Sequence, residues 1–252
     1  MLETQDLGIR FGGHQAVDGV SCRFAPGTLT ALVGPNGAGK TTYFNLISGQ
    51  LRPTAGRVLL DGRAIEHTGA AQRARLGLGR AFQLTNLFPN LSVRENLRLV
   101  LQSVREGPHR HGRNFWSVWR DVQALGEAAD ALLERIALTA RAARPARELS
   151  HGDQRKLEVG MLMAMDPKVY LFDEPTAGMS ADEAPVVLDL IRGLRADRTK
   201  TVLLVEHKLD VVRELADRIV VLHNGRLICE GDPATAMASS AVRDAYLGMA
   251  TA

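Results

Sequence analysis

The stretch from Gly34 to Thr42 constrains the fold of this chain more than any other segment. Within it, Gly34 and Gly39 enclose four residues, and Lys40 and Thr41 follow directly, which is the pattern G-x-x-x-x-G-K-[ST]. An apolar run precedes the pattern and a helix-compatible segment follows it, as a phosphate-binding loop requires. We therefore expect a strand, a tight glycine turn and a helix in direct succession.

Each residue type in this stretch has a physical role in binding phosphate. Glycine permits backbone angles that other residues avoid, so successive N–H groups can point into one concavity and bind an anion. The helix expected over 41–48 adds the partial positive charge of its N-terminus. Lys40 can reach the β- and γ-phosphates of a nucleotide, and the Thr41 hydroxyl can ligate Mg²⁺. The alternative is an ordinary glycine turn, which the apolar strand expected at 29–33 disfavours.

Length and composition set broad limits on the class of protein. A chain of 252 residues, 45% hydrophobic and 23% charged, can bury a sizeable core as one large domain or as a core with a subdomain. The net charge of +3 is too small to indicate a nucleic-acid partner. Cys22 and Cys229 lack metal-ligand spacing and are expected to be reduced, buried thiols. We find neither a signal-peptide pattern nor an apolar window of about 18 residues, so we expect a cytoplasmic protein.

The order of turn signals and apolar runs predicts an α/β fold. Strands joined by turns are expected over 1–31, and strand–helix alternation beyond them predicts a mostly parallel sheet flanked by helices. The segment 86–150 differs, because Ser92 and Glu95 form a capping box and Ala- and Leu-rich helices follow, which predicts an inserted all-α subdomain. Later strands are expected at 57–62, 77–82, 168–174, 201–205, 218–222 and 226–230. Helices are expected at 64–75, 96–104, 121–138, 153–165, 181–195 and 208–216.

Two carboxylates end the apolar strand expected at 168–174. In an open parallel sheet, ligands collect at the carboxyl ends of strands, which places Asp173 and Glu174 beside the phosphate loop. One carboxylate can hold Mg²⁺ through water while its neighbour orients or deprotonates an attacking water. The alternative is a charged strand end facing solvent. The apolar residues before the two acids and Pro175 after them disfavour it.

Three further residues take their meaning from context. His207 follows the apolar strand expected at 201–205 and could touch a γ-phosphate, although a lone histidine at such a place indicates a structural role. Gln83 taken alone is an ordinary polar loop residue. Phe11 taken alone is as readily a core residue as a ligand contact.

Taken in order, these segments resemble the nucleotide-binding subunit of an ATP-binding cassette (ABC) transporter over nearly the whole chain. Gln83 stands at the position of the Q-loop glutamine, and the segment 149–154, Leu-Ser-His-Gly-Asp-Gln, resembles the signature Leu-Ser-Gly-Gly-Gln. The segment 170–174 matches the Walker B strand. The segment 176–180 lies at the D-loop, and His207 lies at the switch histidine.

The resemblance implies ATP and Mg²⁺ as cofactors and assigns roles to residues. Glu174 is then the general base, His207 and Gln83 complete the catalytic set, and Phe11 stacks on adenine. The residues implied in holding Mg²⁺ are Thr41, Gln83 and Asp173. The residues implied in binding the nucleotide are Phe11, Val17, Gly34, Pro35, Asn36, Gly37, Ala38, Gly39, Lys40, Thr41, Thr42, Ser150 and Gly152.

The resemblance also implies a domain organisation. A single ABC ATPase domain spans 1–252, with a P-loop NTPase core of the RecA-like type and an antiparallel β subdomain in 1–85 and 151–252. The inserted helical subdomain occupies 86–150 and carries the signature at its end.

Three residues depart from the family pattern. His151 and Asp153 replace a glycine and the glutamine of the signature, and Ser180 stands where the D-loop usually has aspartate. Ser150 and Gly152 are kept, so contact with a γ-phosphate is expected to persist, with Asp153 adding a negative charge near it.

The family mechanism implies several partners. Two cassettes, identical or paralogous, pair head to tail, so that each ATP is clamped between the phosphate loop of one and the Ser150 segment of the other. Two transmembrane permease subunits bind this pair at the inner face of the cell membrane, and the segment 84–97 resembles the surface that accepts a helix from a permease. A periplasmic solute-binding protein takes part indirectly, and no nucleic acid is implied.

A finer resemblance points to importers of branched-chain amino acids. It rests on the long helical insertion around 105–145, the Leu-Ser-His-Gly segment, the Ala-Gly-Met D-loop and the sequence Ala-Tyr-Leu-Gly at 245–248. Importers of urea and short amides look alike in these features. A lipopolysaccharide-type exporter generally lacks so long an insertion, and a soluble ABC ATPase usually carries a coiled-coil arm or two cassettes. A P-loop kinase of small molecules does not account for the Ser-His-Gly segment.

Overall fold

A computed structural model describes residues 1–81, 87–106, 115–240 and 242–243, and the chain divides into two compact units. The first unit comprises 1–80, 167–174 and the segment from 194 onward. The second comprises 81–166 and 175–193, so it takes in residues on both sides of the 86–150 insertion expected from the sequence. Each unit is described by itself.

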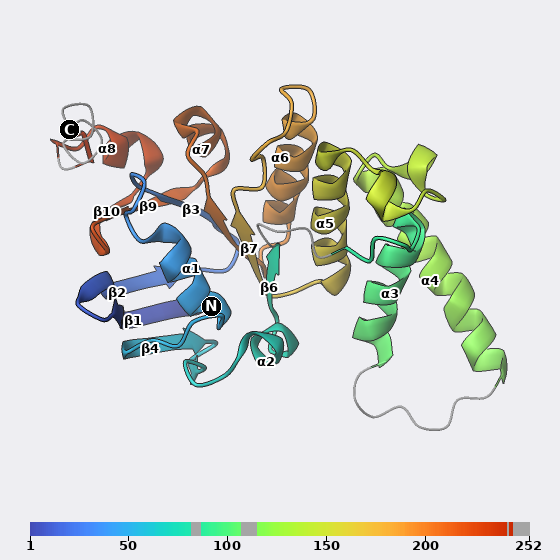
Figure 1. Cartoon of the computed structure of the whole chain (residues 1–252), viewed down its shortest axis with the longest axis horizontal. Coiled ribbons are helices and arrows are strands. Elements are labelled where there is room, and N and C mark those ends of the chain that lie inside the picture. The colour runs from blue at the N-terminus through green and yellow to red at the C-terminus, as the bar shows by residue number, and fades with distance from the viewer. Residues whose placement is uncertain (82–86, 107–114, 241, 244–252) are drawn as a thin grey trace. The chain divides into compact units, whose positions relative to one another are not determined.

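The first unit begins with an antiparallel sheet of four strands in the order β2-β1-β4-β5, of which Figure 1 labels β2, β1 and β4. Their bounds are β1 Leu2–Phe11, β2 His14–Phe24, β4 Ala55–Leu60 and β5 Arg63–Ala64. The Gly12-Gly13 turn joins β1 to β2, with Phe11 paired to His14, as the hairpin signal predicts. This sheet confirms the expected antiparallel β region at the N-terminus.

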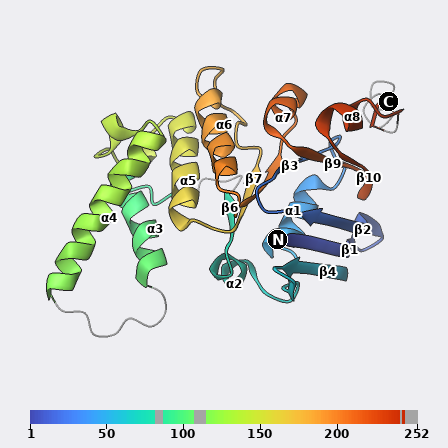
Figure 2. The ribbon, with the colours of Figure 1, turned by 180° about the vertical axis from the view of Figure 1, so that it is seen from behind.

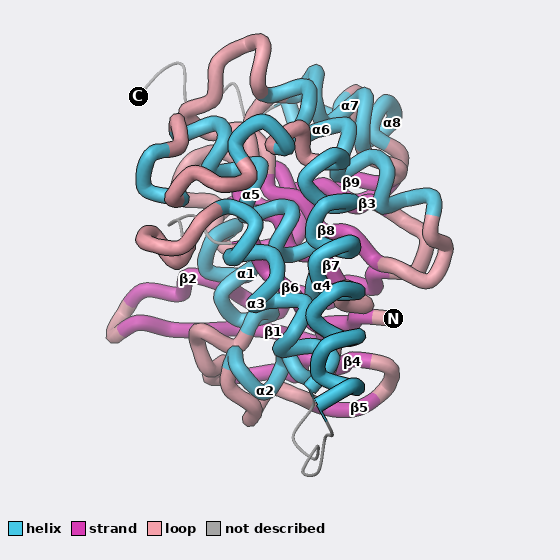
Figure 3. The backbone as a smooth tube through the Cα atoms, turned by 90° about the vertical axis from the view of Figure 1, so that its right-hand side faces the viewer, coloured by secondary structure: helices cyan, strands magenta, loops and turns pink. Residues whose placement is uncertain are grey.

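A second sheet of six strands forms the centre of the unit, in the order β10-β9-β3-β8-β7-β6. Their bounds are β3 Leu29–Val33, β6 Leu78–Ala81, β7 Val169–Asp173, β8 Thr201–Val205, β9 Arg218–His223 and β10 Arg226–Gly231. The pairs β3–β8, β3–β9 and β7–β8 are parallel, and Figure 3 draws these strands in magenta. All residues of β3, β7 and β8 are buried, because parallel strands covered on both faces read as continuous apolar runs.

The helix α1 Lys40–Ser48 shares one hydrophobic core with both sheets. Its Tyr43, Phe44 and Ile47 are fully buried against residues of β1 and β2 and against Leu32 of β3. The neighbours of Leu32 along β3, Ala31 and Val33, point to the opposite face, where they pack with residues of α7 and α8, as the two-residue period of a strand dictates. The remaining helices of this unit are α2 Ala70–Arg75, η3 Leu194–Ala196, α7 Leu209–Leu215 and α8 Pro233–Met237.

The second unit is built from helices (Figure 2). They are α3 Val93–Glu106, α4 Phe115–Arg135, η1 Thr139–Arg141, η2 Ala146–Glu148, α5 His151–Met165 and α6 Ala184–Gly193. The predicted capping box is present at the start of α3, where the N–H of Glu95 donates to Ser92 Oγ over 3.1 Å and the N–H of Ser92 donates to Glu95 Oε2 over 2.8 Å. Among the described residues, no helix is both long and apolar enough to cross a bilayer.

Some element boundaries differ from the sequence-based expectation for local physical reasons. The helix expected from 64 begins only at Ala70, because Ala64 belongs to β5 and Gly69 precedes the first helical turn. The helix expected from 181 begins at Ala184, because Ser180 bonds to Glu183 and forms a turn first. Of the two cysteines, Cys22 is buried as expected, whereas Cys229 is only partly buried.

Candidate functional site

The loop between β3 and α1 has a shape that only glycine permits at two positions. Gly34 has φ 148° and Gly39 has φ 94°. A Cβ at Gly34 would overlap the carbonyl oxygen of Leu222, and a Cβ at Gly39 would lie 2.5 Å from the carbonyl oxygen of Ala16. The two glycines named by the sequence pattern therefore let the loop pass close to neighbouring backbone.

Lys40 folds back over this loop. Its Nζ donates to the carbonyl oxygens of Gly34 and Pro35 over 2.7 and 2.9 Å. Burial lowers the pKa of Lys40, and the nearby carboxylates of Glu174 and Asp173 oppose that shift. The ammonium group is thus placed over the loop and in the field of both carboxylates.

A cavity of about 400 Å³ opens above the loop. Its lining consists of Phe11, His14, Ala16, Asn36, Gly37, Ala38, Gly39, Lys40, Thr41, Thr42, Glu174 and His207. The structure therefore brings the phosphate loop together with Phe11, Glu174 and His207, three of the site residues predicted from the sequence. Phe11 is 48% exposed, which leaves its ring free to contact a ligand rather than core.

Some of the expected site residues lie elsewhere. The Val17 side chain is fully buried in the core and does not line the cavity. Gln83 lies outside the described residues. His14 and Ala16, which sequence reasoning missed, line the cavity because the hairpin pairs His14 with Phe11. That pairing could have been derived from the Gly12-Gly13 turn.

The ends of β7 and β8 bring Glu174 and His207 together. Asp173 is paired with Val205 in the parallel register, and the N–H of Glu174 donates to the carbonyl of Val205 over 3.0 Å. His207 Nε2 lies 2.5 Å from Glu174 Oε1. Glu174 has φ 50°, a left-handed conformation that costs a residue with a side chain roughly 1–2 kcal/mol. Strain of this kind at a cavity wall is typical of a functional position.

Asp173 points away from solvent, with 1% of its side chain exposed. Arg80 Nη2 donates to Asp173 Oδ2 over 2.6 Å, so the carboxylate charge is paired. No sequence signal identified Arg80, because its partner lies in a distant segment of the chain.

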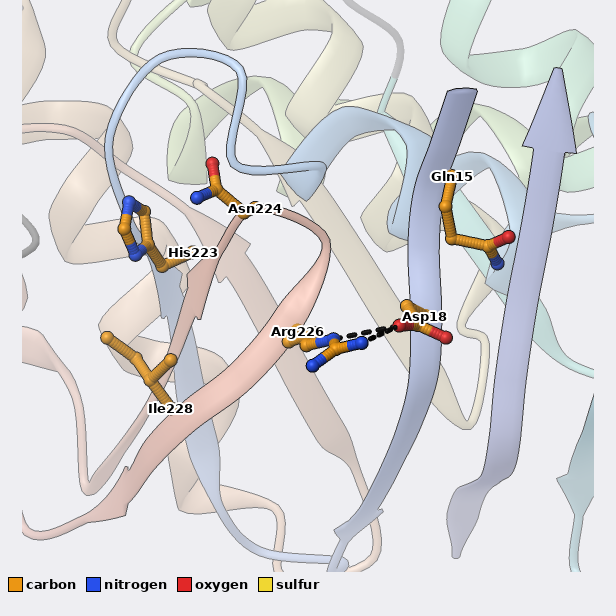
Figure 4. A pocket seen from close by; sticks show the side chains of 6 residues that line it. All are labelled: Gln15, Asp18, His223, Asn224, Arg226 and Ile228. Carbon is orange, nitrogen blue, oxygen red and sulfur yellow. Dashed lines mark hydrogen bonds and ion pairs between the residues drawn. The ribbon is translucent and has the colours of Figure 1, made fainter. Parts of the chain in front are cut away.

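A second pocket, of about 450 Å³, is lined by residues of β2, β9, β10 and the turn between β9 and β10 (Figure 4). Its lining comprises Gln15, Asp18, His223, Asn224, Arg226 and Ile228. Arg226 pairs with Asp18 over 2.7 Å and thereby ties β10 to β2. The N–H of Asp18 donates to Gly225 O, and the N–H of Gly225 donates to Ala38 O of the loop. We therefore assign these contacts to support of the phosphate loop.

The signature segment forms a separate cluster within the second unit. Ser150 is the N-cap of α5, and its Oγ accepts from the N–H of Asp153 and donates to Glu183 Oε1 over 3.4 Å. His151, which replaces a glycine of the family pattern, has its Nε2 3.3 Å from the carbonyl oxygen of Ala177. The capping bond to Asp153 and the contact with Glu183 therefore hold the side chain of Ser150 in place.

The Asp153 charge is compensated within the chain. Its side chain is 2% exposed, and it pairs with Lys156 Nζ over 3.1 Å and with Arg141. Two cations of the same unit therefore balance this carboxylate, and its effect on a phosphate contact stays a prediction.

The residues around the cavity fit a nucleoside triphosphate. The backbone cradle is closed to any side chain at two glycines, and α1 begins at the cavity, so its N-terminal N–H groups lie against the expected phosphates. Among the described residues, no three His, Cys, Asp or Glu side chains form a metal site of their own. Mg²⁺ suits this arrangement, because it is commonly held by one carboxylate together with phosphate oxygens.

Comparison with known proteins agrees with this geometry. The family model described as ABC transporter matches residues 17–177. The chain is 37% identical to the high-affinity branched-chain amino acid transport ATP-binding protein LivG of Escherichia coli K12, covering 99% of this chain and 98% of the relative. It is 38% identical to BraF of Pseudomonas aeruginosa, a protein of the same description, with the same coverage.

Two solved structures are similar over most of the chain. One is an ATP-binding cassette of an ABC transporter in its ADP conformation, with a TM-score of 0.81, 30% identity and coverage of 98% of both chains. The other is a nucleotide-free ATP-binding cassette from an ABC transporter, with a TM-score of 0.80, 28% identity and the same coverage. The matched family model, the full-length relatives and the fold agree with the phosphate loop and its cavity, and the chain belongs to the ABC transporter family of ATP-binding cassettes.

Proposed function

We propose that this chain is the ATP-hydrolysing subunit that powers a membrane importer of branched-chain amino acids. The observation that supports ATP hydrolysis most strongly is the single cavity shared by the phosphate loop, Glu174 and His207. The near-full-length similarity to two branched-chain amino acid transport ATP-binding proteins supports the choice of solute.

In this proposal the loop residues bind the phosphates and Phe11 stacks on the adenine. Lys40 turns from the carbonyls of its own loop to the β- and γ-phosphates, which offer it stronger, charge-assisted bonds. Thr41 and Asp173 hold Mg²⁺, together with Gln83, and the cation supplies charge neutralisation on the phosphates.

The carboxylate of Glu174 acts as the general base. It orients the attacking water and accepts its proton, while His207 holds Oε1 through the 2.5 Å contact. The water oxygen bonds to the γ-phosphorus while the bond from that phosphorus to the β,γ-bridging oxygen breaks, and the products are inorganic phosphate and ADP.

The chain carries out transport as part of an assembly. Two cassettes close over ATP, with Ser150 and Gly152 of one copy facing the phosphate loop of the other. The pair binds two permease subunits at the inner face of the membrane, and a periplasmic solute-binding protein delivers the solute. In this proposal the chain divides into a core that binds the nucleotide and a helical part that carries the signature segment.

Uptake measured in cells of the source organism tests this proposal. Deletion of this chain is expected to abolish high-affinity uptake of radiolabelled leucine, isoleucine and valine. Expression of the wild type should restore uptake, and expression of Glu174→Gln, which we expect to assemble but to hydrolyse ATP far more slowly, should not. Normal amino acid uptake after deletion would contradict the assignment. Loss of urea or acetamide uptake instead would identify the amide-importer alternative, and a lipid-export defect would identify the exporter.

A further inference from the structure

Arg80, on β6, contacts both the carboxylate of Asp173 and the helix that follows the phosphate loop. Its side chain is 6% exposed and that of Asp173 is 1% exposed. Nη2 donates to Asp173 Oδ2 over 2.6 Å. Because both groups are almost excluded from water, this contact fixes the carboxylate more firmly than a surface ion pair would.

The other terminal nitrogen of the Arg80 guanidinium faces α1 and the residues just after that helix. Nη1 donates to Asn45 Oδ1 over 2.7 Å, to Ser48 Oγ over 2.9 Å and to Gln50 Oε1 over 3.1 Å. The guanidinium carbon lies 5.7 Å from the centre of the Phe44 ring. The segment that begins at the phosphate loop therefore fixes the guanidinium, and the guanidinium fixes Asp173.

We propose that Arg80 is a positioning residue for the ATPase site. Its guanidinium holds the carboxylate of Asp173 in one orientation relative to α1, the helix that follows the phosphate loop. This inference rests on the proposed function, in which Asp173 holds Mg²⁺. An ionised carboxylate has two oxygens, and Arg80 takes Oδ2, so Oδ1 is the oxygen left to the cation or its water.

Arg73 supplies a matched control. It is fully buried, and its Nη1 donates to the carbonyl oxygens of Leu46 and Ile47 over 2.6 Å, on the same helix. Its Nε donates to the carbonyl of Thr68. The loss of Arg73 should therefore weaken the packing of α1 without releasing the Asp173 carboxylate.

The experiment compares Arg80→Met, Arg80→Lys and Arg73→Met in a Glu174→Gln background, which keeps ATP intact. ATP affinity is measured in EDTA, the affinity of the ATP complex for Mn²⁺ is measured by electron paramagnetic resonance, and stability is measured by urea unfolding. Arg80→Met should lower Mn²⁺ affinity by about 10-fold or more, because partners that orient a metal ligand typically contribute that much. Its ATP affinity in EDTA should stay within about 3-fold of the parent, because the loop is untouched.

The two companion variants separate positioning from folding. Arg73→Met should lower the urea midpoint and leave Mn²⁺ affinity unchanged. Arg80→Lys keeps the charge but cannot contact Asp173 and α1 with two separate nitrogens, so it should recover only part of the Mn²⁺ affinity. The same variant replaces Arg80→Met in the comparison if Arg80→Met does not fold. With Glu174 intact, the Arg80 variants should lose kcat with little change in KM for ATP.

Three outcomes would overturn the inference. Unchanged Mn²⁺ affinity in Arg80→Met, or an equal loss in Arg73→Met, would show that Arg80 only supports the fold. A parent protein that binds no ATP in either condition would overturn the proposed function and the Arg80 role together. Loss of Mn²⁺ affinity in the Arg80 variants alone would support the Arg80 role and leave the proposed function intact.

Discussion

The imidazole of His207 lies in direct contact with the carboxylate of Glu174, with Nε2 2.5 Å from Oε1. Glu174 directly follows β7, His207 lies two residues beyond the neighbouring parallel strand β8, and both residues line the cavity above the phosphate loop. Glu174 is held in a left-handed backbone conformation, so its side chain is placed by the fold as well as by the histidine. In the proposed mechanism, the histidine holds one oxygen of the Glu174 carboxylate, and the other oxygen is left to accept the proton of the attacking water.

We expect His207→Ala to lower the rate of ATP hydrolysis by about 10- to 100-fold, because a carboxylate that is no longer held spends less time in the productive orientation. ATP affinity should change little in comparison. His223→Ala is a suitable control, because this histidine lines the second pocket instead. Steady-state phosphate release and equilibrium ATP binding measure both effects. A His207→Ala protein with wild-type turnover would remove the histidine from this role.

We expect Lys40→Met to weaken ATP binding by about 10- to 100-fold, because a hydrogen bond to a charged group contributes about 1.5–3 kcal/mol. The substitution keeps the length of the side chain and removes the ammonium group that now bonds to Gly34 and Pro35. Isothermal titration calorimetry with ATP gives the affinity. An unchanged dissociation constant would argue against contact between Lys40 and the phosphates.

We expect Asp153→Asn to lower the free energy of unfolding by about 2–3 kcal/mol, because it leaves the mostly buried Lys156 and its neighbour Arg141 without their anion. Asp189→Asn is the matched control, since Asp189 pairs with Arg192 at an exposed site and should cost about 0.5 kcal/mol or less. Urea unfolding curves of the two variants provide the comparison. Equal losses of stability in the two variants would show that the buried ion pairs of Asp153 stabilise the fold no more than an exposed pair does.

The parts of the fold that sequence predicts well are those decided by local pattern. The strands at 29–33 and 201–205 have the predicted bounds, because each is an uninterrupted apolar run between clear turn signals. The capping box of Ser92 and Glu95 is likewise local and is confirmed. The proximity of Glu174 to the phosphate loop followed from the general rule that parallel strands end at one edge of the sheet.

The parts that sequence does not predict depend on partners far apart in the chain. Arg80 and Asp173 are separated by 93 positions, and no period or motif connects them. The two cations that balance Asp153 come from η1 and from one turn further along α5, so the compensation depends on how these elements pack. Helix α6 begins three residues later than expected, because Ser180 and Glu183 bond to each other in a turn that competes with the helix.

The measurement that tests the central claim most directly is single-turnover hydrolysis of ATP by the wild type and by Glu174→Gln, with bound nucleotide quantified in the same samples. The glutamine keeps the shape of the side chain and cannot accept the proton of the attacking water. We expect the variant to bind ATP with an affinity close to that of the wild type, to hydrolyse it at least about 100-fold more slowly, and to accumulate as an ATP-bound dimer. Hydrolysis by Glu174→Gln at the wild-type rate would contradict the claim that this carboxylate activates the water.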